Sequence, residues 1–211
     1  MKIKITTLVV VATLIVSCAE EVKNDNNEEA KSIELKPEVV QDTIVGMKPK
    51  VIVENSYALY PFQLGDNIIA MSPLPGKVNL AEDIQTIQAA GITKMVTLVS
   101  QEELEAKGLS DYFAMMEDAG IEVYHSPVVD YGLPRKAQVD SIINFMELQK
   151  DANENVLIHC MGGYGRSGTI MGCYAKVVLE DPNPLQFVRD VRGAEAIETK
   201  EQEEFVKTFN D

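Results

Sequence analysis

The sequence predicts an α/β fold with a mainly parallel central sheet of about 4–5 strands and helices on both faces. Three observations predict this class. Short apolar runs alternate along the chain with segments whose apolar residues recur at helical spacing. The chain has 211 residues, of which 45% are hydrophobic and 25% are charged, so one domain with a proper core fits easily. No repeat of about 20–50 residues is evident, which argues against a solenoid.

The first half of the predicted domain, from about residue 56, contains two strands and two or three helices. The run NIIAMS (67–72) predicts a strand, and the Pro-Leu-Pro-Gly after it ends that strand. Asn79, with a glutamate three residues later, predicts the start of a helix that closes at Gly91. The run KMVTLVS (94–100) predicts a buried strand, and one or two helices follow up to Ala119.

The second half repeats the alternation and ends in helices. The strand IEVYHSPVV (121–129) is followed by an amphipathic helix over 136–150 and the strand NVLIHC (155–160). Three further helices are expected at 165–180, 183–192 and 199–209. Ligands of such sheets bind beyond the carboxyl ends of the strands, and Cys160 lies at such an end.

The first residues, 1–17, predict a signal peptide. Two lysines precede an apolar run over 5–16, which is too short to span a bilayer. The run ends in LIVSC (14–18), which resembles the lipobox of bacterial lipoproteins. The resemblance implies that Cys18 is acylated and anchors the chain to a membrane of a bacterial cell envelope, on the periplasmic or cell-surface side. The alternative is an ordinary signal peptide in which Cys18 is incidental.

Residues 18–55 predict an acidic flexible tether ahead of a domain at 56–211. The stretch after Cys18 lacks aromatic residues and a sustained apolar period. The alternative is a short packed helix, best placed at 28–36. The whole chain has a formal net charge of −14, a poor match for nucleic acid, so we expect no nucleic-acid partner. Any phosphate binding must therefore come from a local site.

The segment IHCMGGYGRSGTI (158–170) predicts an anion-binding loop between a strand and a helix. Its glycines permit a backbone that curls so that the N–H groups point inward. Those groups and the helix dipole favour a thiolate at Cys160, placed to attack phosphorus. Arg166 offers a planar fork for two phosphate oxygens, and Ser167 can donate a hydrogen bond to the sulfur. The residues expected around the phosphate are Met161, Gly162, Gly163, Tyr164, Gly165 and Arg166. The alternative is a glycine-rich turn in a buried core.

This stretch resembles the signature of the cysteine-dependent protein-tyrosine phosphatases, which is His-Cys, five residues, Arg, then Ser or Thr. HCMGGYGRSGT is most similar to the small dual-specificity and cyclin-dependent-kinase-inhibitor-3-like branch. The resemblance implies a protein-tyrosine-phosphatase-like fold and spans roughly residues 65–209. It also implies that Cys160 is the nucleophile, Arg166 the phosphate clamp and Ser167 the thiolate stabiliser. His159 would tune the loop by hydrogen bonding.

The chemistry also needs a proton donor for the leaving oxygen, because a thiolate cannot supply one. The segment PVVDYGLP places Asp130 in a loop after a strand, 30 residues before Cys160, and resembles the general-acid loop of the family, Asp with a Pro four positions on. We therefore expect Asp130 to be the general acid, which later takes a proton from the hydrolytic water. The alternative is that Asp130 only forms a turn before Tyr131.

Three further residues are candidates for supporting roles. The segment AIETKEQEEF resembles the part of tyrosine phosphatases that positions the hydrolytic water. Glu198 stands where the larger enzymes have a glutamine, which leaves that role open. Gln202 has either a supporting role or a place on the plain helix surface. Glu103 either orients Arg166 through a bidentate pair or belongs to a solvated helix start.

The remaining thiol and the second histidine are expected to be structural. Cys173 shares a helix face with apolar residues and is expected in the core, although a disulfide with Cys160 is an alternative in an oxidising compartment. His125 is expected to be a satisfied buried group. Tyr164 lines the rim of the pocket or packs against the helix. Neither thiol has the spacing of a metal site, so we expect no cofactor and no metal.

The expected substrate is a phosphorylated protein. In the family that the loop resembles, members that act on inositol lipids or inositol phosphates tend to carry lysines in this loop. Here the loop has no lysine and the chain is acidic, so the resemblance disfavours those substrates. Phosphotyrosine is the first expectation, with phosphoserine or phosphothreonine also open, and so is a small non-protein phosphate ester. Two other classes remain as alternatives: a phosphoprotein-binding module with weak or no turnover, and a sulfurtransferase or arsenate-reducing thiol enzyme.

Overall fold

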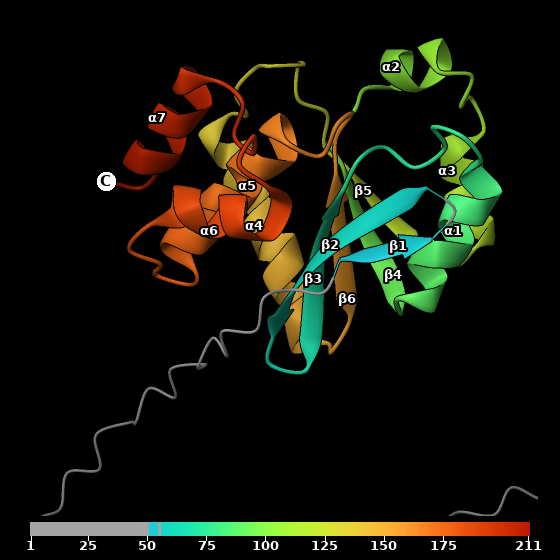
Figure 1. Cartoon of the computed structure of the whole chain (residues 1–211), viewed down its shortest axis with the longest axis horizontal. Helices are drawn as coiled ribbons and strands as arrows, with labels where there is room; N and C mark the ends of the chain where they lie inside the picture. Colours follow the sequence, from blue (N-terminus) through green and yellow to red (C-terminus); the bar gives the residue numbers. More distant parts are fainter. Residues whose placement is uncertain (1–50, 55) are drawn as a thin grey trace, which may run out of the picture. The chain divides into compact units, whose positions relative to one another are not determined.

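The computed structural model describes residues 51–54 and 56–211 (Figure 1). The predicted signal peptide, Cys18 and nearly all of the predicted tether lie outside the described residues. Within the described part, no helix is both long and apolar enough to cross a bilayer. The predicted α/β class is confirmed: a mostly parallel sheet lies between two groups of helices.

The sheet has six strands in the order β1-β2-β3-β6-β4-β5. Strand β6 lies at its centre, and β3, β6, β4 and β5 run parallel to one another. The strands are β1 (Ile52–Glu54), β2 (Tyr57–Leu64), β3 (Asn67–Ser72), β4 (Ile92–Thr97), β5 (Glu122–His125) and β6 (Asn155–His159). All four predicted strands are present, and β5 is the shortest of them because the chain leaves the sheet after His125.

The expectation of about 4–5 strands is too low, because an antiparallel hairpin adds β1 and β2 at one edge. β1 takes its three residues from the end of the segment assigned to the tether. Gly65, with φ +60°, opens the two-residue turn between β2 and β3, as type II′ hairpin turns require. Pro61 is tolerated within β2 because β1 pairs only with residues 57–59, so no ladder partner needs its missing N–H.

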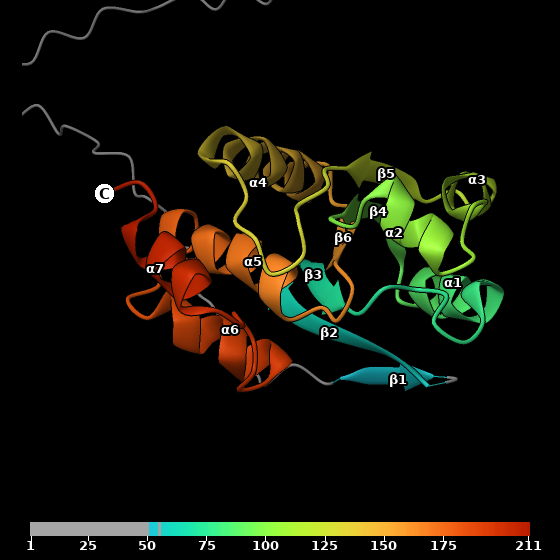
Figure 2. The ribbon, with the colours of Figure 1, turned by 90° about the horizontal axis from the view of Figure 1, so that it is seen from above.

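Seven helices cover the two faces of the described sheet. They are α1 (Leu80–Ala89), α2 (Gln101–Ala106), α3 (Tyr112–Asp118), α4 (Lys136–Asp151), α5 (Gly165–Val177), α6 (Pro184–Arg192) and α7 (Lys200–Thr208). One core packs α1–α3 against the sheet, and the other packs α4–α7 against the opposite face. Figure 2 shows these two groups of helices on either side of the strands.

Side-chain caps confirm three of the predicted helix starts. The Asn79 side chain accepts hydrogen bonds from the amides of residues 81 and 82 at the start of α1, and Gly91 follows that helix with φ +69°. Asn183 caps α6 and Thr199 caps α7 in the same way. Each such cap contributes about 0.5–2 kcal/mol.

The parallel strands end level with one another at the site. His159, the last residue of β6, pairs with Ser72 of β3 and Thr97 of β4. Cys160 follows directly, so the loop from β6 to α5 lies beyond the carboxyl ends of the central strands. In Figure 2 the loop between β5 and α4 reaches toward the amino end of α5.

Candidate active site

The loop between β6 and α5 is held in a tight curve around the sulfur of Cys160. Cys160 is 2% exposed, and the backbone N–H of Gly163 donates to its Sγ at 3.2 Å. Gly163 has φ +74°, and a Cβ there would lie 2.3 Å from the carbonyl oxygen of Ser72. Only glycine fits this close approach between the loop and the end of β3. The predicted strand–loop–helix arrangement is therefore present.

Arg166 lies in the first turn of α5 and is 1% exposed. Its Nη1 donates to the Glu103 carboxylate at 3.0 Å and to the carbonyl of Val128 at 3.0 Å. Burial opposes the charge, but the Glu103 hydrogen bond and the nearby Cys160 and Asp130 outweigh it and raise the pKa of the guanidinium. Arg166 is therefore a permanent cation beside the sulfur.

Two other nitrogens of the same guanidinium are left for a ligand. Within the described residues, buried Nε and Nη2 have no hydrogen-bond acceptor, although Nη2 lies 2.9 Å from a carboxylate oxygen of Asp130. Buried N–H groups in this state cost free energy unless a partner arrives. The guanidinium is thus anchored through Nη1 and offers Nε and Nη2 to an anion.

Glu103 lies at the start of α2 and also pairs with Arg166, but the bidentate pair that the sequence offered as an alternative is not formed. It forms a capping box with Ser100 at the start of α2, where the Ser100 N–H donates to its Oε2 at 2.8 Å. The same oxygen accepts from Nη1 of Arg166, so the pair is made through one oxygen and is not bidentate. Burial works against the charged form, but the Arg166 and Ser100 hydrogen bonds lower the pKa of Glu103 overall.

Asp130 lies in the loop between β5 and α4, facing Arg166. Its side chain is 54% exposed. The turn around it is closed by a hydrogen bond of 2.8 Å from the Gly132 N–H to the Val129 carbonyl, and Tyr131 has φ +56°. The structure thus brings the predicted acid, the cysteine and the arginine together from loops that are 30 or more residues apart.

His159 is buried among hydrogen-bonding partners below the loop. Its Nε2 lies 2.8 Å from both Thr97 Oγ1 and the Tyr112 hydroxyl, and its Nδ1 lies 3.3 Å from the carbonyl of Cys160. Desolvation lowers the pKa of His159 to about 4, so the ring is neutral near pH 7. A neutral ring that donates from Nδ1 to the Cys160 carbonyl keeps one lone pair at Nε2, which the two hydroxyls share.

Ser167 has not formed the hydrogen bond to sulfur that the sequence predicts. It is fully buried, and its Oγ has no partner among the described residues. In its place the Gly163 N–H is the group that meets Sγ. The hydroxyl of Ser167 is therefore an unused donor at the start of α5.

Gln202 is fully buried, so the alternative of a plain helix surface is wrong. Its Oε1 accepts from the N–H groups of Glu198 and Thr199, and its Nε2 donates to the Gly132 carbonyl at 3.2 Å. Glu198 itself is exposed, but its Oε2 reaches the start of α5, where a Cβ on Gly165 would lie 2.3 Å away. Gln202 thus joins α7 to the loop that contains Asp130.

Arg192 is a site residue that the sequence did not single out. Its Nε donates to the carbonyl of Gly163 at 2.9 Å and its Nη2 to that of Gly162 at 2.8 Å. The guanidinium lies between the rings of Tyr60 and Tyr164, at 3.9 and 3.5 Å from their centroids. Since loop N–H groups can face an anion only if the carbonyls face outward, Arg192 fixes the curl of the loop from outside.

The remaining candidates have structural surroundings. Cys173 is fully buried in the core as predicted, and burial raises the pKa of its thiol to about 12. Cys160 and Cys173 are both free. The expectation of a buried His125 is wrong: it lies exposed on edge strand β5, where Nε2 contacts the Val99 carbonyl at 2.9 Å.

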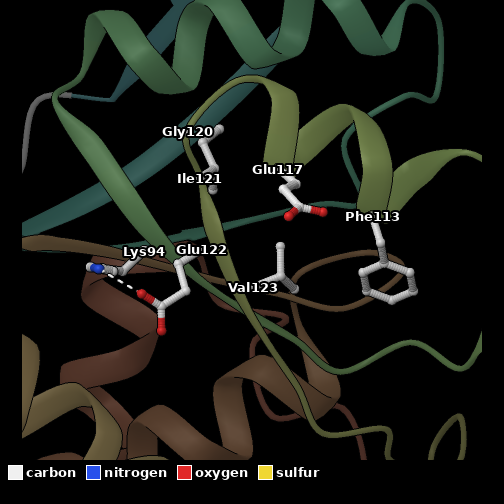
Figure 3. Close-up of a pocket in the computed structure, with 7 residues that line it drawn as sticks. All are labelled: Lys94, Phe113, Glu117, Gly120, Ile121, Glu122 and Val123. Atoms are coloured by element: carbon white, nitrogen blue, oxygen red, sulfur yellow. Dashed lines mark hydrogen bonds and ion pairs between the residues drawn. The ribbon is translucent and has the colours of Figure 1, made fainter.

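Two cavities differ in their position relative to this loop. A cavity of about 470 Å³ lies near the amino ends of β4 and β5, where Lys94 pairs with Glu122 at 2.7 Å (Figure 3). Because the strands are parallel, this is the end of the sheet opposite Cys160. A second cavity, of about 580 Å³, adjoins the loop itself and is lined by Met161, Gly162 and Tyr164. Tyr164 therefore lines the rim of a pocket.

The arrangement suits a tetrahedral oxyanion. A buried sulfur, a curled backbone and two unsatisfied guanidinium nitrogens converge beyond the central strands, and a carboxyl group faces them. Such preorganised donors stabilise charge that develops on oxygen atoms in a transition state.

Comparisons with known proteins agree with this geometry. The family described as "Swiss Army Knife protein, DSP-PTPase phosphatase domain" matches residues 75–206. Cyclin-dependent kinase inhibitor 3 of Sus scrofa is 28% identical over 152 residues, which span 68% of this chain and 72% of that protein.

Solved structures give the same result. Kinase associated phosphatase (KAP), with serine in place of its catalytic-site cysteine, has a TM-score of 0.62 at 26% identity and covers 66% of this chain and 83% of its own. The active form of Tk-PTP has a TM-score of 0.54 at 31% identity and covers 66% and 88%.

Proposed function

Because the chain belongs to the family of dual-specificity-type protein-tyrosine-phosphatase (DSP-PTPase) domains, we propose that it hydrolyses phosphomonoesters through a cysteinyl-phosphate intermediate, most readily on phosphotyrosine in a protein. Phosphoserine and phosphothreonine are the secondary substrates of this proposal. The observation that supports it best is the buried Arg166, whose Nε and Nη2 are unsatisfied beside a buried Cys160.

In the first step the Cys160 sulfur attacks phosphorus while the loop N–H groups and Arg166 hold the three equatorial oxygens. The S–P bond forms as the P–O bond to the leaving group breaks. Asp130 gives its proton to the departing oxygen, which makes a neutral alcohol or phenol. The Asp130 carboxylate contacts Arg166 Nη2 in the free site, and the incoming phosphate takes its place on that nitrogen. The displaced carboxylate takes a proton from solvent, and this is the proton that it gives to the leaving oxygen.

In the second step water attacks phosphorus and the S–P bond breaks. Asp130, now a carboxylate, takes a proton from that water, and the thiolate returns. Ser167 is proposed to donate its unused O–H to the sulfur as charge builds up on it. Glu198 and Gln202 act nearby: Gln202 holds the loop of Asp130, and Glu198 lies at the start of α5.

The experiment measures hydrolysis of p-nitrophenyl phosphate and of a phosphotyrosine peptide by the full chain. Cys160→Ser should abolish turnover on both. Asp130→Asn should lower kcat by ~10²–10⁴, the contribution of general-acid catalysis. Cys173→Ser is the matched control, because this thiol is also free and buried but lies in the core. Turnover that survives Cys160→Ser would refute the mechanism, and an unchanged rate in Asp130→Asn would show that another group is the acid.

The wild-type chain in the same assay decides between turnover and binding. A phosphoprotein-binding module would retain phosphopeptide affinity and show no hydrolysis in the wild-type chain. The presence of nucleophile, clamp and acid in one site favours turnover.

The cellular setting is a separate proposal that rests on the sequence alone. We propose that Cys18 is acylated and that the domain acts on the outer side of a bacterial membrane, on phosphoproteins of the cell envelope. Metabolic labelling with a palmitate analogue should mark the wild-type chain and leave Cys18→Ser unmarked.

A further inference from the structure

The cavity of about 580 Å³ beside the phosphate loop has a strongly positive lining. Met161, Gly162 and Tyr164 of the loop form one wall. Its charged lining side chains are all cations: Lys77, Lys107 and Arg192. This is unusual in a chain whose formal net charge is −14.

The wall that contains Lys77 is fixed to the phosphate loop. The N–H of Leu74 donates to the Met161 carbonyl at 3.1 Å. Gly76 has φ +93°, and a Cβ there would lie 2.8 Å from Leu109 Cδ2, so the turn packs directly on the segment after Lys107. The Gly76 N–H donates to buried Asp83 at 2.7 Å, which holds the turn from behind. These contacts set the backbone of Lys77 at one place beside the loop.

The two lysines have no compensating carboxylate. Lys77 and Lys107 are exposed, and neither forms an ion pair with any residue that the structure describes. In the cavity at the other end of the sheet, by contrast, Lys94 is neutralised by Glu122 (Figure 3). Arg192 adds its charge to the same wall while it holds the loop carbonyls. The positive potential of this cavity is therefore free to act on a ligand.

We propose that this cavity binds a second anionic group of the substrate, so that the enzyme prefers phosphopeptides with a carboxylate or another phosphate close to the phosphoresidue. The inference rests on the proposed phosphatase function and names its substrate class. A peptide fits better than a membrane surface, because the cations line a cavity of about 580 Å³ that one acidic side chain can enter, whereas a bilayer surface is too broad to enter it. The loop N–H groups and Arg166 hold the scissile phosphate, and Lys77 and Lys107 hold its acidic neighbour.

The test compares two phosphotyrosine peptides that differ only in having glutamate or glutamine on both sides of the phosphotyrosine. The full chain should show a kcat/KM for the glutamate peptide that is roughly 3- to 10-fold higher, mainly through KM, as expected for two exposed ion pairs. In Lys77→Gln/Lys107→Gln this ratio should fall to about one, and p-nitrophenyl phosphate hydrolysis should not change. High salt should reduce the wild-type ratio, because exposed charges are screened.

The matched control is Lys94→Gln/Lys176→Gln, which removes the same charge from other faces and should keep the ratio. A wild-type ratio near one, or a ratio that survives in Lys77→Gln/Lys107→Gln, would overturn the inference. The inference would also be overturned if Lys77→Gln/Lys107→Gln lost hydrolysis of phosphatidylinositol phosphate in vesicles and kept hydrolysis of both peptides, since the cavity would then bind a lipid headgroup. If p-nitrophenyl phosphate is not hydrolysed at all, the proposed function has failed. If it is hydrolysed without peptide preference, only this inference has failed.

Discussion

Gln202→Ala should uncouple the loop of the proposed acid from the rest of the site. The amide of the side chain makes three hydrogen bonds: Oε1 accepts from the N–H groups of Glu198 and Thr199, and Nε2 donates to the Gly132 carbonyl. A net contribution of ~0.5–1.5 kcal/mol per hydrogen bond gives a stability loss of about 2–4 kcal/mol. Of these three bonds, only the one to Gly132 reaches the loop that contains Asp130. Losing it should therefore lower the fraction of molecules that hold this loop in the position seen here by roughly 2- to 10-fold.

The assay compares kcat for phenyl phosphate with kcat for p-nitrophenyl phosphate. Phenol is the poorer leaving group and depends more on a proton from Asp130, so Gln202→Ala should lower its rate more. The matched control is Thr199→Ala. It removes the hydrogen bond from the Gln202 N–H at the cap of α7, which costs about 1 kcal/mol, but leaves the bond to Gly132 in place.

Thr199→Ala should therefore reduce stability and leave the ratio of the two rates unchanged. The reasoning is refuted if Gln202→Ala lowers both rates equally, or if Thr199→Ala changes the ratio by as much. In either case Gln202 would be part of the core only.

Three further predictions concern the phosphate loop. Gly163→Ala should destabilise the fold by several kcal/mol and abolish turnover, because the added Cβ would meet the Ser72 carbonyl. Urea denaturation measures the loss of stability. The control is Gly65→Ala, where the added Cβ meets nothing within 4 Å and only the positive φ costs about 1 kcal/mol. Arg192→Gln should lower phosphate affinity about tenfold, measured by competitive inhibition with inorganic phosphate. Burial lowers the pKa of His159 to about 4, so between about pH 6.5 and 4 the unfolded state binds a proton that the folded state does not. The free energy of unfolding should therefore fall by about 2–4 kcal/mol as the pH drops through that window. In His159→Gln it should fall by less.

The parts of the site that lie close together in the sequence could be predicted from it. The spacing from Cys160 to Arg166, the glycines between them and the helix start are all local, and the structure places them as expected. The loop that contains Asp130 could also be located from the sequence, through its resemblance to the general-acid loop of the family, an Asp with a Pro four positions on. Its approach to Arg166 depends on the parallel order of β4, β5 and β6, which brings their carboxyl ends together.

The contacts that fix the loops from outside could not be predicted, because they join distant segments through side chains with no distinctive pattern. Arg192 reaches Gly163 across 29 residues, and Gln202 reaches Gly132 across 70. Both look like ordinary polar residues of amphipathic helices. The missed hairpin is different, since a Gly-Asp pair between two apolar runs is a known signal for a two-residue turn. Pro61 weakens that signal, because proline within a run argues against a central strand.

Arg166 connects the stability of the domain with its chemistry. A buried guanidinium is costly unless its donors are satisfied, and the fold satisfies only Nη1, through Glu103 and two backbone carbonyls. Asp130 lies within ion-pair distance of Nη2, but it is half exposed, so the compensation it offers is weak. The fold thus leaves the Nε and Nη2 donors of this guanidinium without a hydrogen-bond acceptor at the amino end of α5, and an anion with several oxygens relieves that cost better than one carboxylate can. The same imbalance explains why the site should bind phosphate tightly while the rest of the chain, with its large negative charge, repels anions.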